Sequence, residues 1–152
     1  MAEAKVGTGR IEAAAIVSWR GWGGEVSGES GKLKAETATQ VELGGPGQAT
    51  NPEELLAAAL ANCYTSTITA HARAKKIDLA SLETRARTQL AWDEKTPHHI
   101  AEGALSVTLR ANAPEHVLRD LAEEARRHCP ICNALGATAK VTLSVAIAPP
   151  EA

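Results

Sequence analysis

Residues 50–63 read TNPEELLAAALANC and have the composition of a helix start. Asn51 suits the N-cap position, Pro52 suits the first helical position, and Glu54 stands three residues after the cap, as in a capping box. Apolar residues then recur at spacings of three and four as far as Cys63, and the pattern fades at two consecutive lysines. The stretch therefore predicts a long helix that begins at Pro52 and carries Cys63 on its apolar stripe.

Shorter patterns on both sides of this helix predict strands and two further helices. Period-two alternation indicates the strands, while Pro114 suits a helix start and Pro130 ends or kinks the helix before it. The predicted strands cover residues 11–19, 25–28, 32–35, 82–92, 105–109 and 141–147, and the predicted helices cover 52–75, 114–129 and 130–136. We therefore expect one α+β domain over residues 1–152, with helices on one face of an antiparallel sheet.

The composition is that of a globular domain with few aromatic residues. Sixteen Lys+Arg against eighteen Asp+Glu give a formal charge of −2, so the basic excess that attracts nucleic acid or anionic lipid is missing. With no Phe, the core has to use aliphatic side chains together with Trp19, Trp22 and Trp92. The longest apolar run, Leu55 to Ala61, is far shorter than the ~18 residues of a membrane span. Since the sequence shows no targeting segment, we expect a cytoplasmic protein that binds neither nucleic acid nor membrane.

The three cysteines are the candidate reactive residues of the sequence. An odd number as small as three does not indicate a framework of structural disulfides. Cys129 and Cys132 form a C-x-x-C pair, typical of a redox site or of half a zinc site, but a second pair of ligands is missing and we expect no metal there. At the predicted N-cap before Pro130, Cys129 gains from the helix dipole, which favours the thiolate. Cys63 lies ~18 Å from the start of its own helix. Only a cation from elsewhere in the fold would make Cys63 a nucleophile.

Three motifs, taken in order along the chain, resemble the OsmC/Ohr family of osmotically inducible and organic hydroperoxide resistance proteins. The motifs are GGPG at 44–47, TNPEEL at 50–55 with Cys63 on the same helix, and Cys129-Pro130 followed by NA at 133–134. The resemblance spans nearly the whole chain. It implies a thiol peroxidase that acts as an intertwined homodimer, with antiparallel sheets packed on a long central helix and with no metal or organic cofactor.

The resemblance also implies roles for individual residues. Cys63 matches the peroxidatic cysteine, Cys129 the resolving cysteine, and Glu53 the acidic partner of a catalytic arginine. Arg20, in the early hairpin, is the nearest candidate for that arginine. Cys132 departs from the family pattern, because the peroxidase branches commonly carry no thiol there, and it leaves open which cysteine resolves.

We therefore predict a cysteine-based peroxidase of oxidative stress defence that reduces organic, fatty or aryl, hydroperoxides to alcohols. Cys63 becomes a sulfenic acid, Cys129 condenses with it to an intramolecular disulfide, and an external dithiol restores both. Two alternatives stay open. The first is a thiol-disulfide exchange protein that uses Cys129 and Cys132 and leaves Cys63 inert. The second is a non-enzymatic stress or ligand-binding protein on the same fold. The sequence names neither the physiological peroxide nor the reductant.

The spacing of Glu53 and Cys63 leads to a prediction about assembly. The two residues are ten positions apart on one helix, hence ~15 Å along its axis, too far to share a site within one chain. Two copies of the helix that pack antiparallel bring the start of one beside the middle of the other, and an Ala-rich segment at 57–61 suits such close packing. We therefore expect a homodimer in which Glu53 of one chain serves the partner's Cys63.

Overall fold

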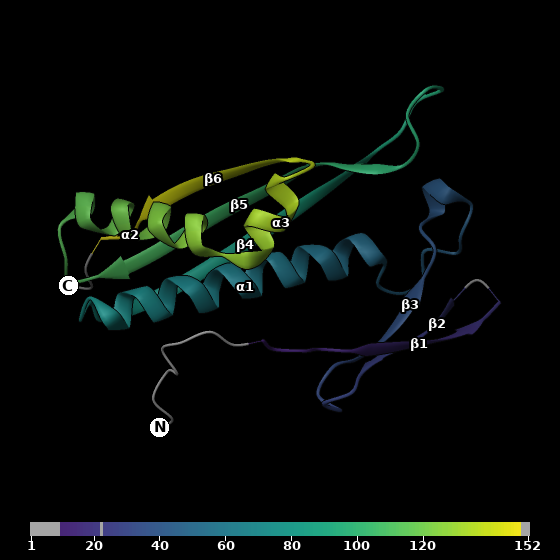
Figure 1. The fold of residues 1–152 in the computed structure, drawn as a ribbon, viewed down its shortest axis with the longest axis horizontal. Coiled ribbons are helices and arrows are strands. Elements are labelled where there is room, and N and C mark those ends of the chain that lie inside the picture. Colours follow the sequence, from purple (N-terminus) through teal and green to yellow (C-terminus); the bar gives the residue numbers. More distant parts are fainter. Residues whose placement is uncertain (1–9, 22, 150–152) are drawn as a thin grey trace. The chain divides into compact units, whose positions relative to one another are not determined.

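The computed structural model describes residues 10–21 and 23–149, and the chain divides into two compact units, one up to Asn51 and one from Pro52. The elements are coloured along the sequence in Figure 1. The first unit contains β1 (Ala15–Arg20), β2 (Gly23–Gly28), β3 (Lys34–Ala38) and the short 3-10 helix η1 (Val41–Leu43). The second contains α1 (Pro52–Ala74), β4 (Leu79–Ala91), β5 (His99–Ala111), α2 (Glu115–His128), α3 (Pro130–Gly136) and β6 (Lys140–Ile147). The single domain expected over residues 1–152 stays a prediction.

The first unit is a three-stranded antiparallel sheet in the order β1, β2, β3. The predicted hairpins are confirmed, and the backbone turns at Gly31, whose φ of 71° favours glycine. The predicted first strand is wrong at its start: β1 begins at Ala15 and not at residue 11. Ala15 pairs with Gly28, where β2 ends, so the residues before Ala15 have no partner strand to extend the ladder.

The two tryptophans that the structure describes do not supply the core material that the sequence predicted. Trp19 on β1 is 58% exposed and Trp92, directly after β4, is 49% exposed. Trp92 lies in the loop between β4 and β5, where its ring faces His98 at a centroid distance of 5.0 Å. Trp22 lies outside the described residues. The core therefore depends on aliphatic side chains and on Tyr64, which is fully buried.

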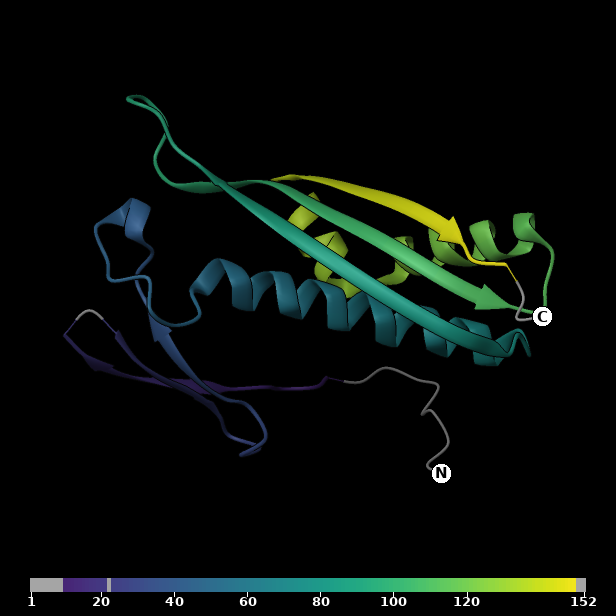
Figure 2. The same ribbon diagram turned by 180° about the vertical axis from the view of Figure 1, so that it is seen from behind.

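In the second unit three helices cover one face of the sheet β4-β5-β6, as both ribbon views show (Figures 1 and 2). β4 and β5 are antiparallel, as predicted, but β6 runs parallel to β5, so the prediction of an antiparallel sheet is wrong for this strand. The chain leaves β5, passes through α2 and α3, and returns in the same direction. Such a helical crossover is the connection that parallel neighbours need.

The core of the second unit lies between these helices and the sheet. The hydroxyl of Tyr64 on α1 donates to the backbone carbonyl of Ala122 on α2 at 3.0 Å. This buried hydrogen bond ties α1 to α2. The largest fully buried side chains are Tyr64, Leu60, Ile68, Leu105, Leu109, Leu118, Leu121, Val107 and Cys129.

The sequence identified helix α1 correctly, but its buried face only in part, since Leu60 is buried and Cys63 packs against the core. The predicted stripe consisted of Leu55, Leu56, Ala59, Leu60 and Cys63, whereas the buried residues of α1 are Leu60, Tyr64, Ile68 and Ala72. Ala59 is exposed and Cys63 is half-buried. Alanine is tolerated on both the buried and the exposed face of a helix, so an Ala-rich pattern does not specify which face is covered.

Within residues 10–21 and 23–149, none of the helices combines the length and the apolar character that crossing a bilayer requires.

Helix α1 ends at Ala74, and Lys76 in the turn after it has a φ of 58°, which is left-handed and strained for a residue with a Cβ atom. The N–H of Ile77 donates to the carbonyl of Ala72 at 2.9 Å and fixes this turn. We expect Lys76→Gly to raise the free energy of unfolding by up to ~1 kcal/mol, since glycine removes the strain. Lys76→Ala keeps the Cβ and should bring no gain. Urea denaturation followed by circular dichroism checks this, and a glycine variant no more stable than the alanine variant contradicts it.

Candidate active site

The structure brings the three cysteines together where the middle of α1 meets the start of α3. All three are free thiols; Cys63 is half-buried, and Cys129 and Cys132 are buried. Cys63 packs against the buried cluster that contains Cys129 and Cys132. The Cys129 side chain raises the pKa of both Cys63 and Cys132, so it is a neighbour of both thiols.

Cys129 is the N-cap of α3, as predicted from the proline that follows it. Its backbone is extended, with φ −72° and ψ 116°, Pro130 begins the helix, and the N–H of Cys132 donates to the Cys129 sulfur at 3.4 Å. Asn133 secures the same corner. Its N–H donates to the Cys129 carbonyl at 3.1 Å, and its side-chain amide donates to the carbonyl of Arg127 at 3.0 Å. The position of Cys129 is thus fixed by α2 on one side and by α3 on the other.

The groups around the Cys63 thiol shift its pKa in opposite directions. Burial, the largest influence, raises the pKa of Cys63 above its ordinary value, and the neighbouring Cys129 also raises it. The backbone N–H of Ile131, through a hydrogen bond, and the nearby side chain of Thr67 lower the pKa, but the balance stays on the raised side. The surroundings of Cys63 therefore favour the thiol, in agreement with the inference that a cation from elsewhere is needed.

Ile131 and Thr67 are site residues that the sequence analysis missed. Thr67 lies one turn after Cys63 on α1, and its hydroxyl donates to the Cys63 carbonyl at 2.9 Å. The N–H of Ile131 belongs to the first turn of α3, where no carbonyl of the same helix can accept it. Pro130 is the signal for that turn, but the sequence does not indicate which side chain from α1 receives the N–H.

The surroundings of Cys132 disfavour its thiolate. Burial and the neighbouring Cys129 raise the pKa of Cys132 to about 12. A group with this pKa is protonated at neutral pH, and the thiolate is the nucleophilic form of cysteine. The structure therefore argues against a leading role for Cys132.

The other two predicted site residues lie on different units. Glu53 is half-buried in the first turn of α1, and its backbone carbonyl accepts a hydrogen bond from the Thr88 hydroxyl at 2.9 Å, which ties the start of α1 to β4. Arg20 is the last residue of β1 in the first unit, and its side chain lies outside the described residues. The pairing of Arg20 with Glu53 stays a prediction.

The chain is similar in sequence to a known protein family. The model of a family described as OsmC-like protein matches residues 45–144. Among characterised sequences, Organic hydroperoxide resistance protein-like 2 from Staphylococcus epidermidis is 30% identical over 140 residues, which covers 91% of this chain and 97% of that protein. The match includes both cysteine-bearing segments, α1 and the start of α3.

Two solved structures have the same fold over nearly their whole length. An organic hydroperoxide resistance protein from Legionella pneumophila is 30% identical, with a TM-score of 0.80 over 91% of this chain and 99% of that one. An organic hydroperoxide resistance protein from Elizabethkingia anophelis is 25% identical, with a TM-score of 0.80 over 92% of this chain and 99% of that one. The α+β fold implied by the sequence resemblance is confirmed.

Proposed function

Because the chain belongs to the OsmC-like protein family, we propose that it is a cysteine-based peroxidase that reduces organic hydroperoxides to alcohols. The names of its relatives support the substrate class and a redox role. The observation that carries the proposal is the packing of Cys63 against the buried cluster that contains Cys129, whose side chain raises the pKa of Cys63. A thiol that can be oxidised and a second thiol beside it are the two parts that a disulfide-forming peroxidase needs.

The reaction has three steps. The Cys63 thiolate attacks one oxygen of the hydroperoxide, the O–O bond breaks, the alkoxide leaves and is protonated to the alcohol, and Cys63 is oxidised to a sulfenic acid. The Cys129 sulfur then attacks the Cys63 sulfur, which forms the disulfide and releases water. An external dithiol reduces the disulfide by exchange and is itself oxidised. The packing of Cys63 against the cluster that contains Cys129 supports the second step, because the resolving thiol is then a neighbour of the sulfenic acid.

A cation is required for the first step, because burial raises the pKa of Cys63. We assign this role to Arg20, held by Glu53 through a bidentate ion pair. The guanidinium then stabilises the thiolate before the reaction and the alkoxide as the O–O bond breaks. The backbone N–H of Ile131 also lowers the pKa of Cys63 and so also stabilises its thiolate.

The proposed active form is a homodimer with two composite sites. Glu53 and Cys63 are ten residues apart on the continuous helix α1, so the rise of an α-helix separates them by ~15 Å. An antiparallel arrangement of two α1 helices brings Glu53 of one chain to the partner's Cys63. Ala58 and Ala59 are exposed on α1, and their small side chains suit a close helix contact. We also propose that the protein works in the reducing cytoplasm, where its three cysteines stay available as thiols.

A peroxide consumption assay tests the proposed function. Purified protein with dithiothreitol should consume cumene hydroperoxide catalytically, produce one alcohol per hydroperoxide, and act more slowly on hydrogen peroxide. Failure to consume either peroxide with all thiols reduced contradicts the proposal. Reduction of insulin disulfides by a protein inactive on peroxides instead supports the exchange-protein alternative, and inactivity in both assays supports a non-enzymatic protein.

Removal of the Cys132 thiol distinguishes the two candidate resolving cysteines. We expect Cys132→Ala to keep hydroperoxide reduction within about threefold of the unmodified protein, because a thiol with a pKa of about 12 contributes little thiolate at neutral pH. Cys129→Ala is the matched variant and should stop disulfide formation. Steady-state rates with dithiothreitol measure both, after circular dichroism has shown that each variant is folded. A loss of more than tenfold in Cys132→Ala assigns the resolving role to Cys132.

A further inference from the structure

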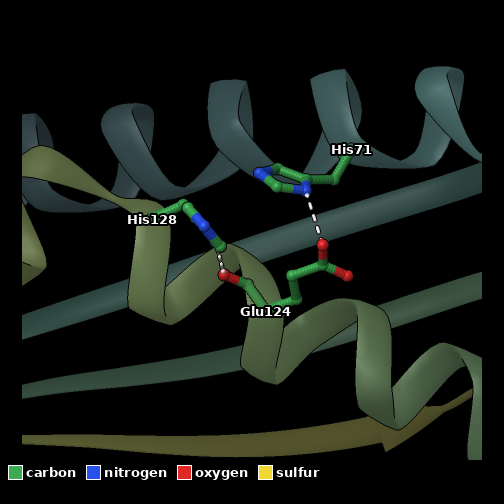
Figure 3. Close-up of side chains that lie close together, drawn as sticks. All are labelled: His71, Glu124 and His128. Carbon is green, nitrogen blue, oxygen red and sulfur yellow. Dashed lines mark hydrogen bonds and ion pairs between the residues drawn. The ribbon is translucent and has the colours of Figure 1, made fainter.

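A second cluster of chemically active side chains lies where α1 faces the C-terminal half of α2. His71 comes from α1, and Glu124 and His128 come from α2, and Figure 3 shows the three side chains turned toward one another. Each offers one ligand atom, and these atoms lie within 4.8 Å of one another. The nearest pair is His71 Nδ1 and Glu124 Oε1, at 3.4 Å.

The geometry of this cluster suits a metal ion. Tetrahedral zinc with ligand distances of ~2.0 Å places its ligand atoms ~3.3 Å apart. The 3.4 Å between His71 Nδ1 and Glu124 Oε1 is already close to that separation. The rings of His71 and His128 have centroids 5.0 Å apart, so both imidazoles lie beside the same glutamate. Two imidazoles and a carboxylate are a ligand set typical of zinc.

His128 is held in an orientation that leaves one nitrogen available. Its Nδ1 lies 2.8 Å from the backbone carbonyl of Glu124. A carbonyl only accepts, so Nδ1 carries the proton, and Nε2 of the neutral ring keeps its lone pair. An imidazole whose other nitrogen donates to a backbone carbonyl is the common arrangement around metal-bound histidine.

Glu124 has one oxygen for each of two neighbours. Lys75 Nζ contacts Oε2 at 2.9 Å, while Oε1 faces His71. Each carboxylate oxygen therefore already faces a basic side chain. Lys75 competes with any cation for the carboxylate.

We propose that His71, Glu124 and His128 bind a divalent transition-metal ion of the zinc type, with a water molecule as the fourth ligand. The ion links the last turns of α1 to the end of α2. Cys63 lies two turns before His71 on α1, and Cys129 follows His128 directly. The site therefore clamps the two segments that carry the thiol pair, and it does so without using any thiol as a ligand.

Titration of the reduced full-length protein with Zn²⁺ and with Co²⁺ at pH 7.5 tests this proposal without reference to peroxidase activity. We expect one equivalent to bind and the thermal unfolding midpoint to rise. His71→Ala should weaken binding at least ~10-fold and remove the rise, as the loss of a ligand requires. His116→Ala, an exposed histidine of α2 outside the cluster, is the matched control and should bind like the unmodified protein.

The Lys75→Gln variant distinguishes a metal site from a purely structural ion pair. It removes the competitor for Glu124, so Zn²⁺ should bind more tightly in this variant, whereas loss of a structural ion pair alone would leave binding unchanged. Affinity for Zn²⁺ equal to that of the unmodified protein in His71→Ala overturns the proposal. Bound Co²⁺ with only an intense sulfur-to-metal charge-transfer band also overturns it, because the ion then lies on the cysteines.

Discussion

Cys63→Ser is expected to lower kcat/KM for organic hydroperoxides by at least about 10³-fold. Serine at this position cannot form a sulfenic acid, so neither the attack on the peroxide nor the later disulfide is available. The substitution is small, and Cys63 is half-buried at the edge of the core, so the fold should persist. Steady-state consumption of cumene hydroperoxide with dithiothreitol measures the loss.

Cys132→Ser is the matched control for this experiment, because it makes the same atomic change in a thiol of the same cluster. It should keep activity while Cys63→Ser loses it. Circular dichroism and the thermal midpoint of both variants separate a chemical effect from unfolding. Retention of more than a small fraction of the original rate in folded Cys63→Ser removes Cys63 from the peroxidatic role.

Subunit mixing gives the second large effect. Glu53→Ala chains and Cys63→Ser chains should each be inactive alone, because one lacks the residue that holds the arginine and the other lacks the nucleophile. After subunit exchange, a heterodimer has one site with both Cys63 and the partner's Glu53 intact. Half of the dimers in an equal random mixture are heterodimers, each with one of two sites intact, so recovery should approach about a quarter of the original activity.

A matched control variant shows whether the effect is specific to Glu53. Glu54→Ala changes the neighbouring, exposed carboxylate in the same turn of α1, and this variant should stay active without any mixing. Exchange is verified by native mass spectrometry of the mixed chains. Proven exchange without recovery places Glu53 in the site of its own chain or outside the chemistry.

Local signals allowed the prediction of most helices and strands. Asn51 with Pro52 marked the start of α1, and Pro130 marked both the end of α2 and the position of Cys129 as the cap of α3. Such signals act within a few residues, so they can be read directly from the chain. The direction of β6 could not be predicted from the sequence, because a strand has the same alternation of side chains whether its neighbour is parallel or antiparallel.

The site could be predicted only in part. Periodicity placed Cys63 on α1, and Pro130 placed Cys129 at a cap. That the two cysteines act together was predicted only from the family resemblance, because their segments lie far apart in the sequence. The N–H of Ile131 is a backbone group, which residue identity does not reveal. Glu124 and His128 stand four residues apart on α2, but the third member of their cluster, His71, comes from α1, and the sequence does not reveal that the two helices meet there.

Peptide mapping by mass spectrometry after one equivalent of organic hydroperoxide tests the central claim that Cys63 and Cys129 form the working redox pair. Reduced protein is treated with cumene hydroperoxide, residual thiols are blocked under denaturing acid conditions, and the cross-linked peptides are identified. We expect a dominant Cys63–Cys129 disulfide, with Cys132 recovered as the blocked thiol. A dominant Cys129–Cys132 or Cys63–Cys132 disulfide contradicts the account, and the first of these supports the exchange-protein alternative.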